Sequence, residues 1–126
     1  MDSGSQPLRC VIVDDNAAFL EAAANILGRD GLTVVGVASS SAEALRCVER
    51  LRPDVAVVDI DLGGESGFDL TEQLADGAAM SSVILTSTHS EQDFADMIAA
   101  SPALGFVPKV ELSADAVLGL LHRGND

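Results

Sequence analysis

Acidic residues follow two apolar stretches of this chain, where strands are expected to end. Val55–Val58 run directly into Asp59, and an earlier apolar stretch runs into Asp14 and Asp15. A short β-branched run indicates a buried strand, and an ionised carboxylate is too costly to bury without water or a cation. We therefore expect Asp59 at the open carboxyl end of its strand, the edge at which open α/β sheets bind ligands.

Two more polar groups follow apolar stretches later in the chain, Thr86-Ser87 and Pro108-Lys109. Carboxylates that face one another raise one another's pKa unless a cation is present. Hard oxygen ligands of this kind suit Mg²⁺, which also bridges carboxylates and phosphate. Acids, a divalent metal, a lysine and a hydroxyl together predict a phosphoryl-transfer site, in which Asp59 is the best nucleophile and would form an acyl phosphate.

The elements that must position these groups alternate along the chain. Apolar runs predict strands over 8–13, 32–38, 55–59, 83–86 and 104–107, and helical spacing predicts helices over 16–27, 41–52, 67–75, 91–100 and 113–121. Asp15 or Asn16 can cap the first helix and Gly28 can end it. This alternation is typical of an α/β fold with a parallel sheet and helices on both faces. For five strands we expect the flavodoxin-like order 2-1-3-4-5.

Composition limits the class of protein. The 126 residues fit one domain, which we place at 7–123, with a flexible leader at 1–6, a tail at 124–126 and no output domain attached. The net charge of −13 disfavours direct contact with nucleic acid or anionic membrane. No apolar run approaches about 18 residues, and the first six residues lack the regions of a signal peptide, so we expect a cytoplasmic protein. Cys10 and Cys47 are expected to be buried, reduced thiols.

The polar groups, taken in order, resemble the receiver domain of two-component response regulators. The resemblance runs from about Leu8 to Leu121 and rests on Asp14-Asp15, Asp59, Gly67 eight residues further on, Ser87 and Pro108-Lys109. It implies that Asp59 is the phosphoacceptor and part of an Mg²⁺ site. The other implied roles are metal-site acids for Asp14 and Asp15, a backbone carbonyl ligand from Asp61, a phosphate partner in Lys109 and a Ser or Thr switch on the fourth strand.

Three positions need separate comment. Ser87 lies 22 residues before Lys109, the spacing expected for the switch, but the neighbouring Thr86 is the more frequent residue type, and only one of the two can face the pocket. Phe106 stands where the family has an aromatic switch, often Tyr; without a hydroxyl it can act by packing alone. Leu62-Gly63 replaces the frequent Met-Pro, so we expect a more flexible loop there.

The resemblance implies a signalling module rather than an enzyme. A histidine kinase or phosphotransfer protein would phosphorylate Asp59, the face formed by the fourth helix, fifth strand and fifth helix would repack, and the output would be an unidentified partner protein or a phosphorelay. Receiver domains can also pair through this face, so a homodimer is a further expectation.

Two alternative functions stay open. One is a receiver-like binding module that takes no phosphate. The other is a haloacid-dehalogenase-like phosphatase, because Asp59-Ile60-Asp61 resembles the Asp-x-Asp of that family. There, however, the motif follows the first strand and a Thr stands two residues beyond the second Asp, where this chain has Gly63.

Overall fold

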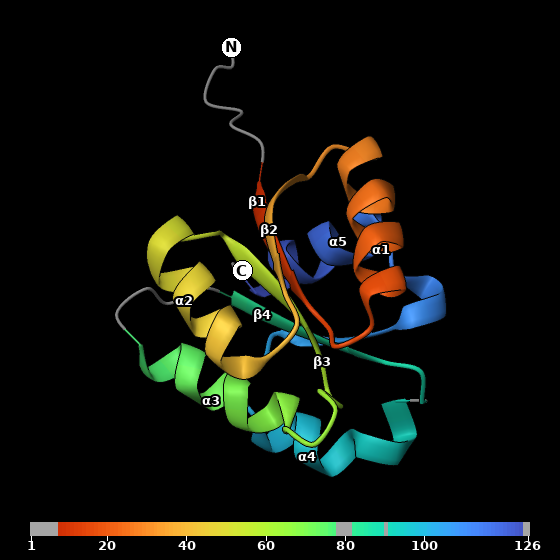
Figure 1. The fold of residues 1–126 in the computed structure, drawn as a ribbon. Coiled ribbons are helices and arrows are strands. Elements are labelled where there is room, and N and C mark those ends of the chain that lie inside the picture. Colours follow the sequence, from red (N-terminus) through yellow and green to blue (C-terminus); the bar gives the residue numbers. More distant parts are fainter. Residues whose placement is uncertain (1–7, 78–81, 90, 125–126) are drawn as a thin grey trace.

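The computed structural model describes residues 8–77, 82–89 and 91–124 (Figure 1). The expected leader at 1–6 and the last two residues of the expected tail lie outside this part of the chain. The strands are β1 (Arg9–Val13), β2 (Thr33–Ala38), β3 (Val55–Asp59), β4 (Ser82–Ser87) and β5 (Gly105–Pro108). The helices are α1 (Ala17–Arg29), α2 (Ser41–Leu51), α3 (Gly67–Asp76), α4 (Ala95–Ala100) and α5 (Ala114–Gly124), with short 3₁₀ helices η1 (Glu91–Phe94) and η2 (Lys109–Glu111).

The strands form one parallel sheet in the order β2-β1-β3-β4-β5, which confirms the predicted fold class and topology. Alternate side chains of the sheet point to two separate apolar cores. Side chains of α2 and α3 fill one core, with α4 packed at its edge, and side chains of α1 and α5 fill the other. Figure 1 shows these helices on the two sides of the sheet. β3 is central and all five of its residues are buried, so Asp59 is held at the end of the most enclosed strand.

Serine and asparagine side chains start the helices. The Asn16 side chain accepts the Phe19 N–H at the start of α1, and Ser40 and Ser66 cap α2 and α3 in the same way. The expectation that Gly28 ends the first helix is wrong, because α1 continues through Arg29. The positive φ that accompanies a helix end lies instead at Gly31, with φ of 112°.

The expected helix over 91–100 is divided. Residues 91–94 form η1 and only 95–100 form α4. Phe94 and Ile98 lie four residues apart and pack against the core. Met97, the other large apolar residue of this short helix, is 53% exposed. An exposed apolar side chain of α4 therefore lies beside residues of α3.

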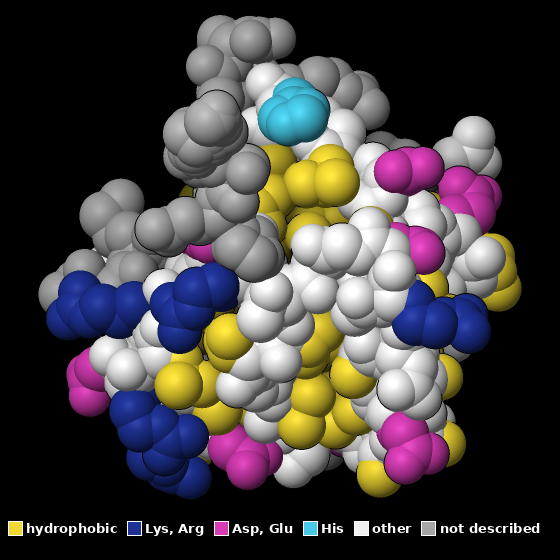
Figure 2. Space-filling model, turned by 90° about the horizontal axis from the view of Figure 1, so that it is seen from above, with side chains coloured by type: hydrophobic (Ala, Val, Ile, Leu, Met, Phe, Trp, Pro, Cys, Tyr) yellow, Lys and Arg dark blue, Asp and Glu magenta, His cyan; other side chains and the backbone are white. Residues whose placement is uncertain are grey.

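Basic residues are confined to part of the chain. All seven Lys and Arg residues lie before residue 53 or after residue 108, so β3, α3, β4, α4 and β5 contain none. Figure 2 looks onto the end of the molecule at which β1 begins, where basic side chains (dark blue) lie at separate places with acidic side chains (magenta) among them. The net charge of −13 is thus unevenly distributed over the surface.

The remaining composition-based expectations concern thiols and membranes. Cys10 and Cys47 are both free and buried, as predicted, and burial raises the pKa of the Cys10 thiol to about 12. Within the part of the chain that the structure describes, no helix has the length and hydropathy needed to cross a bilayer.

Candidate functional site

The ends of three strands bring Asp14, Asp59 and Lys109 together at the carboxyl edge of the sheet. Lys109 Nζ lies 2.6 Å from Asp14 Oδ2 and 3.1 Å from Asp59 Oδ2. β1 and β3 are neighbouring parallel strands, so the acids that follow them meet at one edge, and Lys109 directly follows β5. Asp14 is fully buried and Asp59 is 5% exposed, so the lysine neutralises acids that have little contact with water.

Asp15 completes a cluster of three carboxylates. One oxygen each from Asp14, Asp15 and Asp59 lie within 4.8 Å of one another. An acidic pair before a helix can be a simple cap, but here Asn16 caps α1. Asp14 instead accepts the Asn16 N–H at 2.8 Å through Oδ1 and contacts Lys109 through Oδ2. Neither acid is needed as the N-cap, which leaves this pair available for binding.

This cluster fits a magnesium ion by its chemistry. Three carboxylates of which one is solvent-exposed offer hard oxygen ligands and room for bound water, the combination that Mg²⁺ prefers. Two of the acids already share a cation in Lys109, which shows that the site is built to hold positive charge between them. Asp14, Asp15 and Asp59 are the side chains that could hold the metal.

Burial and neighbouring charges set the ionisation of the site. Burial raises the pKa of Asp59 from 3.8 to about 6, with a smaller contribution from the charge of Asp14, while the Asp61 N–H and Lys109 act in the opposite direction. Burial would lower the pKa of Lys109, but its hydrogen bonds to Asp14 and Asp59 outweigh that effect and raise it. Lys109 therefore stays protonated, and Asp59 is ionised at neutral pH at some energetic cost.

That cost predicts a stabilising substitution. Because the pKa of Asp59 is raised to about 6 in the folded protein, the ionised carboxylate destabilises the folded state. A pKa shift of about two units corresponds to roughly 3 kcal/mol. Asp59→Asn should therefore stabilise the metal-free protein at pH 7 by up to about 3 kcal/mol. The gain should shrink as the pH falls from 6 towards 4, because Asp59 then becomes neutral in both states. Urea denaturation in EDTA over this pH range measures it, and a constant or negative difference would contradict the assignment.

Phe19 is a site residue that sequence reasoning missed. Its ring, in the first turn of α1, lies 4.4 Å from Lys109 Nζ, measured to the ring centroid. A cation over an aromatic face is attracted by the ring quadrupole. The ring thus holds the ammonium group on the side facing α1, while the two carboxylates hold it from the sheet.

The loop after β3 is closed by hydrogen bonds. Asp61 N–H donates to Asp59 Oδ1 at 3.1 Å, and the Asp61 carboxylate accepts the Gly63 N–H at 3.2 Å. The Asp61 side chain is therefore outside the carboxylate cluster, and only its backbone carbonyl was expected to bind metal. Gly63 has a φ of 63°, and a Cβ there would lie 2.6 Å from Asp15 Oδ2. The positive φ favours glycine at this position, whereas the Asp15 carboxylate is the end of an exposed side chain that can move. Greater flexibility of the loop stays a prediction.

The structure places both switch candidates at the end of β4. Thr86 is paired in register with Asp59 and is fully buried, and its hydroxyl has no hydrogen-bond partner in the described chain. Ser87 lies opposite Pro108, and its Oγ accepts the His89 N–H at 3.0 Å. Alternation puts Thr86 on the face of the α1–α5 core and Ser87 on the face of the α3–α4 side. Both remain candidates for the switch.

Aromatic rings connect Ser87 to α3 and α4, a connection that the sequence did not reveal. The His89 ring packs edge-on against Phe94 at 5.9 Å between centroids, and the Phe94 ring lies 6.2 Å from that of Phe68 in α3. Phe106, the predicted aromatic switch, is 8% exposed and belongs to the same core. Its buried position agrees with action by packing.

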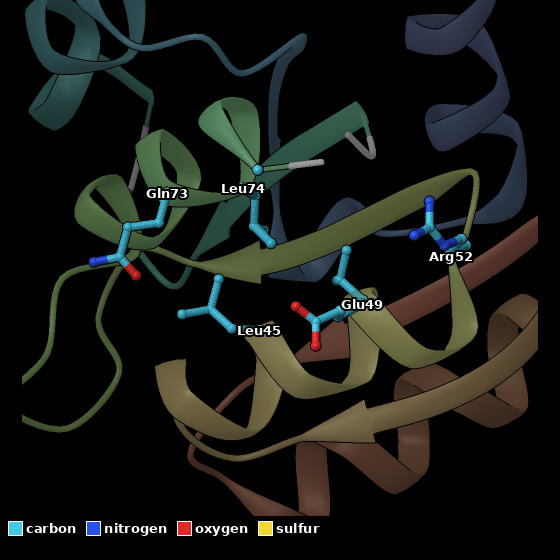
Figure 3. A pocket seen from close by; sticks show the side chains of 7 residues that line it. Leu45, Glu49, Arg52, Gln73 and Leu74 are labelled. Carbon is cyan, nitrogen blue, oxygen red and sulfur yellow. The ribbon is translucent and has the colours of Figure 1, made fainter. Parts of the chain in front are cut away.

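A separate hollow of about 410 Å³ lies between α2 and α3 (Figure 3). Leu45 and Leu74 extend into it, whereas the polar ends of Glu49, Arg52 and Gln73 point in different directions. Polar groups that do not converge provide no specific contacts for a ligand. The chemistry of the chain is therefore concentrated at the carboxyl edge.

Comparison with known proteins agrees with this geometry. The chain is similar to the DNA-binding transcriptional activator EvgA of Escherichia coli K12, with 26% identity over 82% of this chain and 51% of that protein. Among solved structures it is similar to the signal receiver domain of NarL from Mycobacterium tuberculosis, with a TM-score of 0.81, 28% identity and coverage of 90% of this chain and 95% of that one.

A CheY-like receiver domain from Methanospirillum hungatei has the same fold, with a TM-score of 0.77, 22% identity and coverage of 94% of each chain. The chain spans about half the length of the curated relatives it matches. Residues 10–118 match the family described as "Response regulator receiver domain". This match covers most of the sequence, and the chain therefore belongs to the response regulator receiver domain family.

Proposed function

We propose that this receiver domain accepts a phosphoryl group on Asp59 from a histidine kinase or phosphotransfer protein. The observation that carries the proposal is the position of Asp59 at the end of the central strand, 3.1 Å from Lys109 and within 4.8 Å of two further acids. An acid with a purely structural role would not need a lysine and two further carboxylates beside it. Membership of the receiver family supports the same role.

The groups of the site suit in-line transfer. An ionised Asp59 oxygen attacks the phosphorus of a phosphohistidine, an O–P bond forms, and the N–P bond breaks with its electrons passing to the imidazole nitrogen. The pKa of about 6 keeps Asp59 mostly ionised at neutral pH. Lys109, already in contact with Asp59, can pair with an oxygen of the new phosphoryl group. Asp14, Asp15, Asp59 and the Asp61 carbonyl would hold Mg²⁺, which would supply further neutralisation of the phosphoryl charge.

The switch and the output face follow from the same arrangement. In this proposal the hydroxyl of Ser87, or of Thr86, binds the phosphoryl group, and Ser87 would leave the His89 N–H to do so. Phe106 packs beside this strand end, so its surroundings change with the hydroxyl. The face of α4, β5 and α5 would then repack and contact an effector or a second copy of the chain.

The effector can be a separate protein or a segment joined to this chain. The relative EvgA is described as DNA-binding, and this chain matches about half of it. The charge of −13 supports a division of labour in which the receiver itself contacts neither DNA nor membrane. A kinase partner supports a cytoplasmic location, and the family supports signalling rather than enzymatic turnover. Nothing in the fold favours the phosphatase alternative.

Phosphorylation by a small donor tests the proposal. Incubation with Mg²⁺ and acetyl phosphate should add one phosphoryl group to the wild-type chain, seen by intact mass, and none to Asp59→Asn. Asp61→Asn is the matched control and should still be labelled, because its side chain only accepts the Gly63 N–H. Labelling of Asp59→Asn would contradict the assignment. Failure of both acetyl phosphate and a histidine kinase to label the wild type would favour the phosphate-independent binding module.

A further inference from the structure

A shallow groove of about 220 Å³ lies between α3 and α4, away from the carboxylate cluster. Phe68, Asp69 and Glu72 of α3 line one side. Met97 and Ala100 of α4, with Ser101, line the other. Figure 1 shows the two helices next to each other at the lower edge of the molecule. Phe68 and Met97 give the groove apolar lining, and Met97 is 53% exposed, so this apolar side chain is accessible to a partner.

Acids surround this groove without any basic residue. Asp69 and Glu72 line the groove three residues apart on α3 and are exposed. Asp93 of η1 and Asp96 of α4 are also exposed and precede Met97 in the sequence. The segment 53–108 contains ten acids and no Lys or Arg. Among the described residues, none of these four acids takes part in an ion pair. Their charges are therefore available to an incoming partner.

We propose that the α3–α4 groove is a docking surface for a basic amphipathic segment of a partner protein. An apolar side chain of that segment enters between Phe68 and Met97, and Lys or Arg residues beside it pair with Asp69, Glu72 and the acids of η1 and α4. Such segments lay an apolar face into a groove and use flanking charges for register and rate of association. The proposal concerns the surface itself and does not depend on phosphoryl transfer to Asp59.

Charge complementarity favours this occupant over a second copy of the chain. The exposed arginines Arg46 and Arg50 of α2 are interleaved with Glu43 and Glu49, so that helix presents mixed rather than basic charge. The other helices offer no basic face either, since the chain has only seven Lys and Arg residues against 20 acids. Like-charged surfaces repel on encounter, which disfavours self-association through this groove.

The test uses a fluorescent amphipathic peptide of about four helical turns, with Leu on one face and Lys on the other. Its binding to the full chain is followed by anisotropy at physiological salt, where screening suppresses long-range attraction. Glu72→Lys should weaken binding at least about fivefold, and Met97→Gln should weaken it as well. Glu21→Lys, which makes the same charge change on an exposed position of α1, should change it less than about twofold.

Two further measurements decide the location and the occupant. Amide resonance shifts on adding the peptide should be confined to residues 67–76 and 91–101. Equal weakening by Glu72→Lys and Glu21→Lys, or shifts concentrated on other elements, would overturn the proposal, because binding would then reflect net charge alone. Sedimentation of the free chain gives the remaining outcome: a dimer that Glu72→Lys abolishes would make a second copy the occupant and would also overturn it.

Discussion

Gly67→Ala is expected to destabilise the protein by about 3–5 kcal/mol. This loss is larger than the one caused by replacing a glycine on the surface. A Cβ at this position would lie 2.2 Å from the Asp59 backbone oxygen and 2.8 Å from Ile60 Cα. Both are backbone atoms of the site loop, and the Gly67 N–H donates to the Ile60 oxygen at 2.7 Å. The loop cannot move aside without disturbing Asp59 itself, so packing strain and loss of site geometry should occur together.

Gly119→Ala provides the matched control. Gly119 lies inside α5, and an added Cβ would meet no atom within 4 Å. Alanine there should stabilise the helix by roughly 0.5–1 kcal/mol, because glycine loses more backbone entropy on folding. Urea denaturation followed by circular dichroism compares the two variants. If the free energy of unfolding of Gly67→Ala lies within about 1 kcal/mol of the wild-type value, then α3 does not pack tightly against the backbone at Asp59.

Lys109→Met should be the second large effect, and it should depend on magnesium. Removing the lysine leaves the buried acids Asp14 and Asp59 facing each other without their cation. Loss of one partner from a buried charge cluster costs about 3–5 kcal/mol, and we expect about 2–4 kcal/mol because the lysine side chain is 13% exposed. Mg²⁺ should recover much of this loss, since it supplies the missing positive charge.

Thermal unfolding in EDTA and in saturating Mg²⁺ measures this dependence. The variant should gain more from Mg²⁺ than the wild type does. Asp14→Asn combined with Lys109→Met should lose less stability in EDTA than Lys109→Met alone, because one of the unpaired acids is gone. Equal gains from Mg²⁺ in variant and wild type would mean that the metal and Lys109 do not act on the same carboxylates.

Much of the fold could be predicted because its strands are short and apolar and its central strand β3 is fully buried. β3 was placed at its observed bounds, and the acids of Asp14-Asp15 and Asp59 meet because they end neighbouring parallel strands. Helix ends were less predictable. Gly28 is tolerated inside α1 although glycine often ends helices, and η1 breaks the expected ten-residue helix before Ala95.

The parts of the site that the sequence did not reveal depend on long-range contacts. The ring of Phe19 meets Lys109 across 90 positions of sequence, and Gly63 comes close to the Asp15 carboxylate. The choice between Ser87 and Thr86 also needs more than alternation, because both are buried at the strand end, on opposite faces of the sheet, and the Thr86 hydroxyl has no hydrogen-bond partner in the described chain while that of Ser87 accepts the His89 N–H. Spacing identifies such positions but does not give side-chain directions.

The central claim is that the carboxylate of Asp59 is the group that accepts the phosphoryl group. After reaction with Mg²⁺ and acetyl phosphate, borohydride reduces an aspartyl phosphate to homoserine, which peptide mass spectrometry locates in the sequence. The account predicts homoserine at position 59 alone, dependent on Mg²⁺ and on the phosphodonor. Homoserine at Asp14, Asp15 or Asp61 would contradict it.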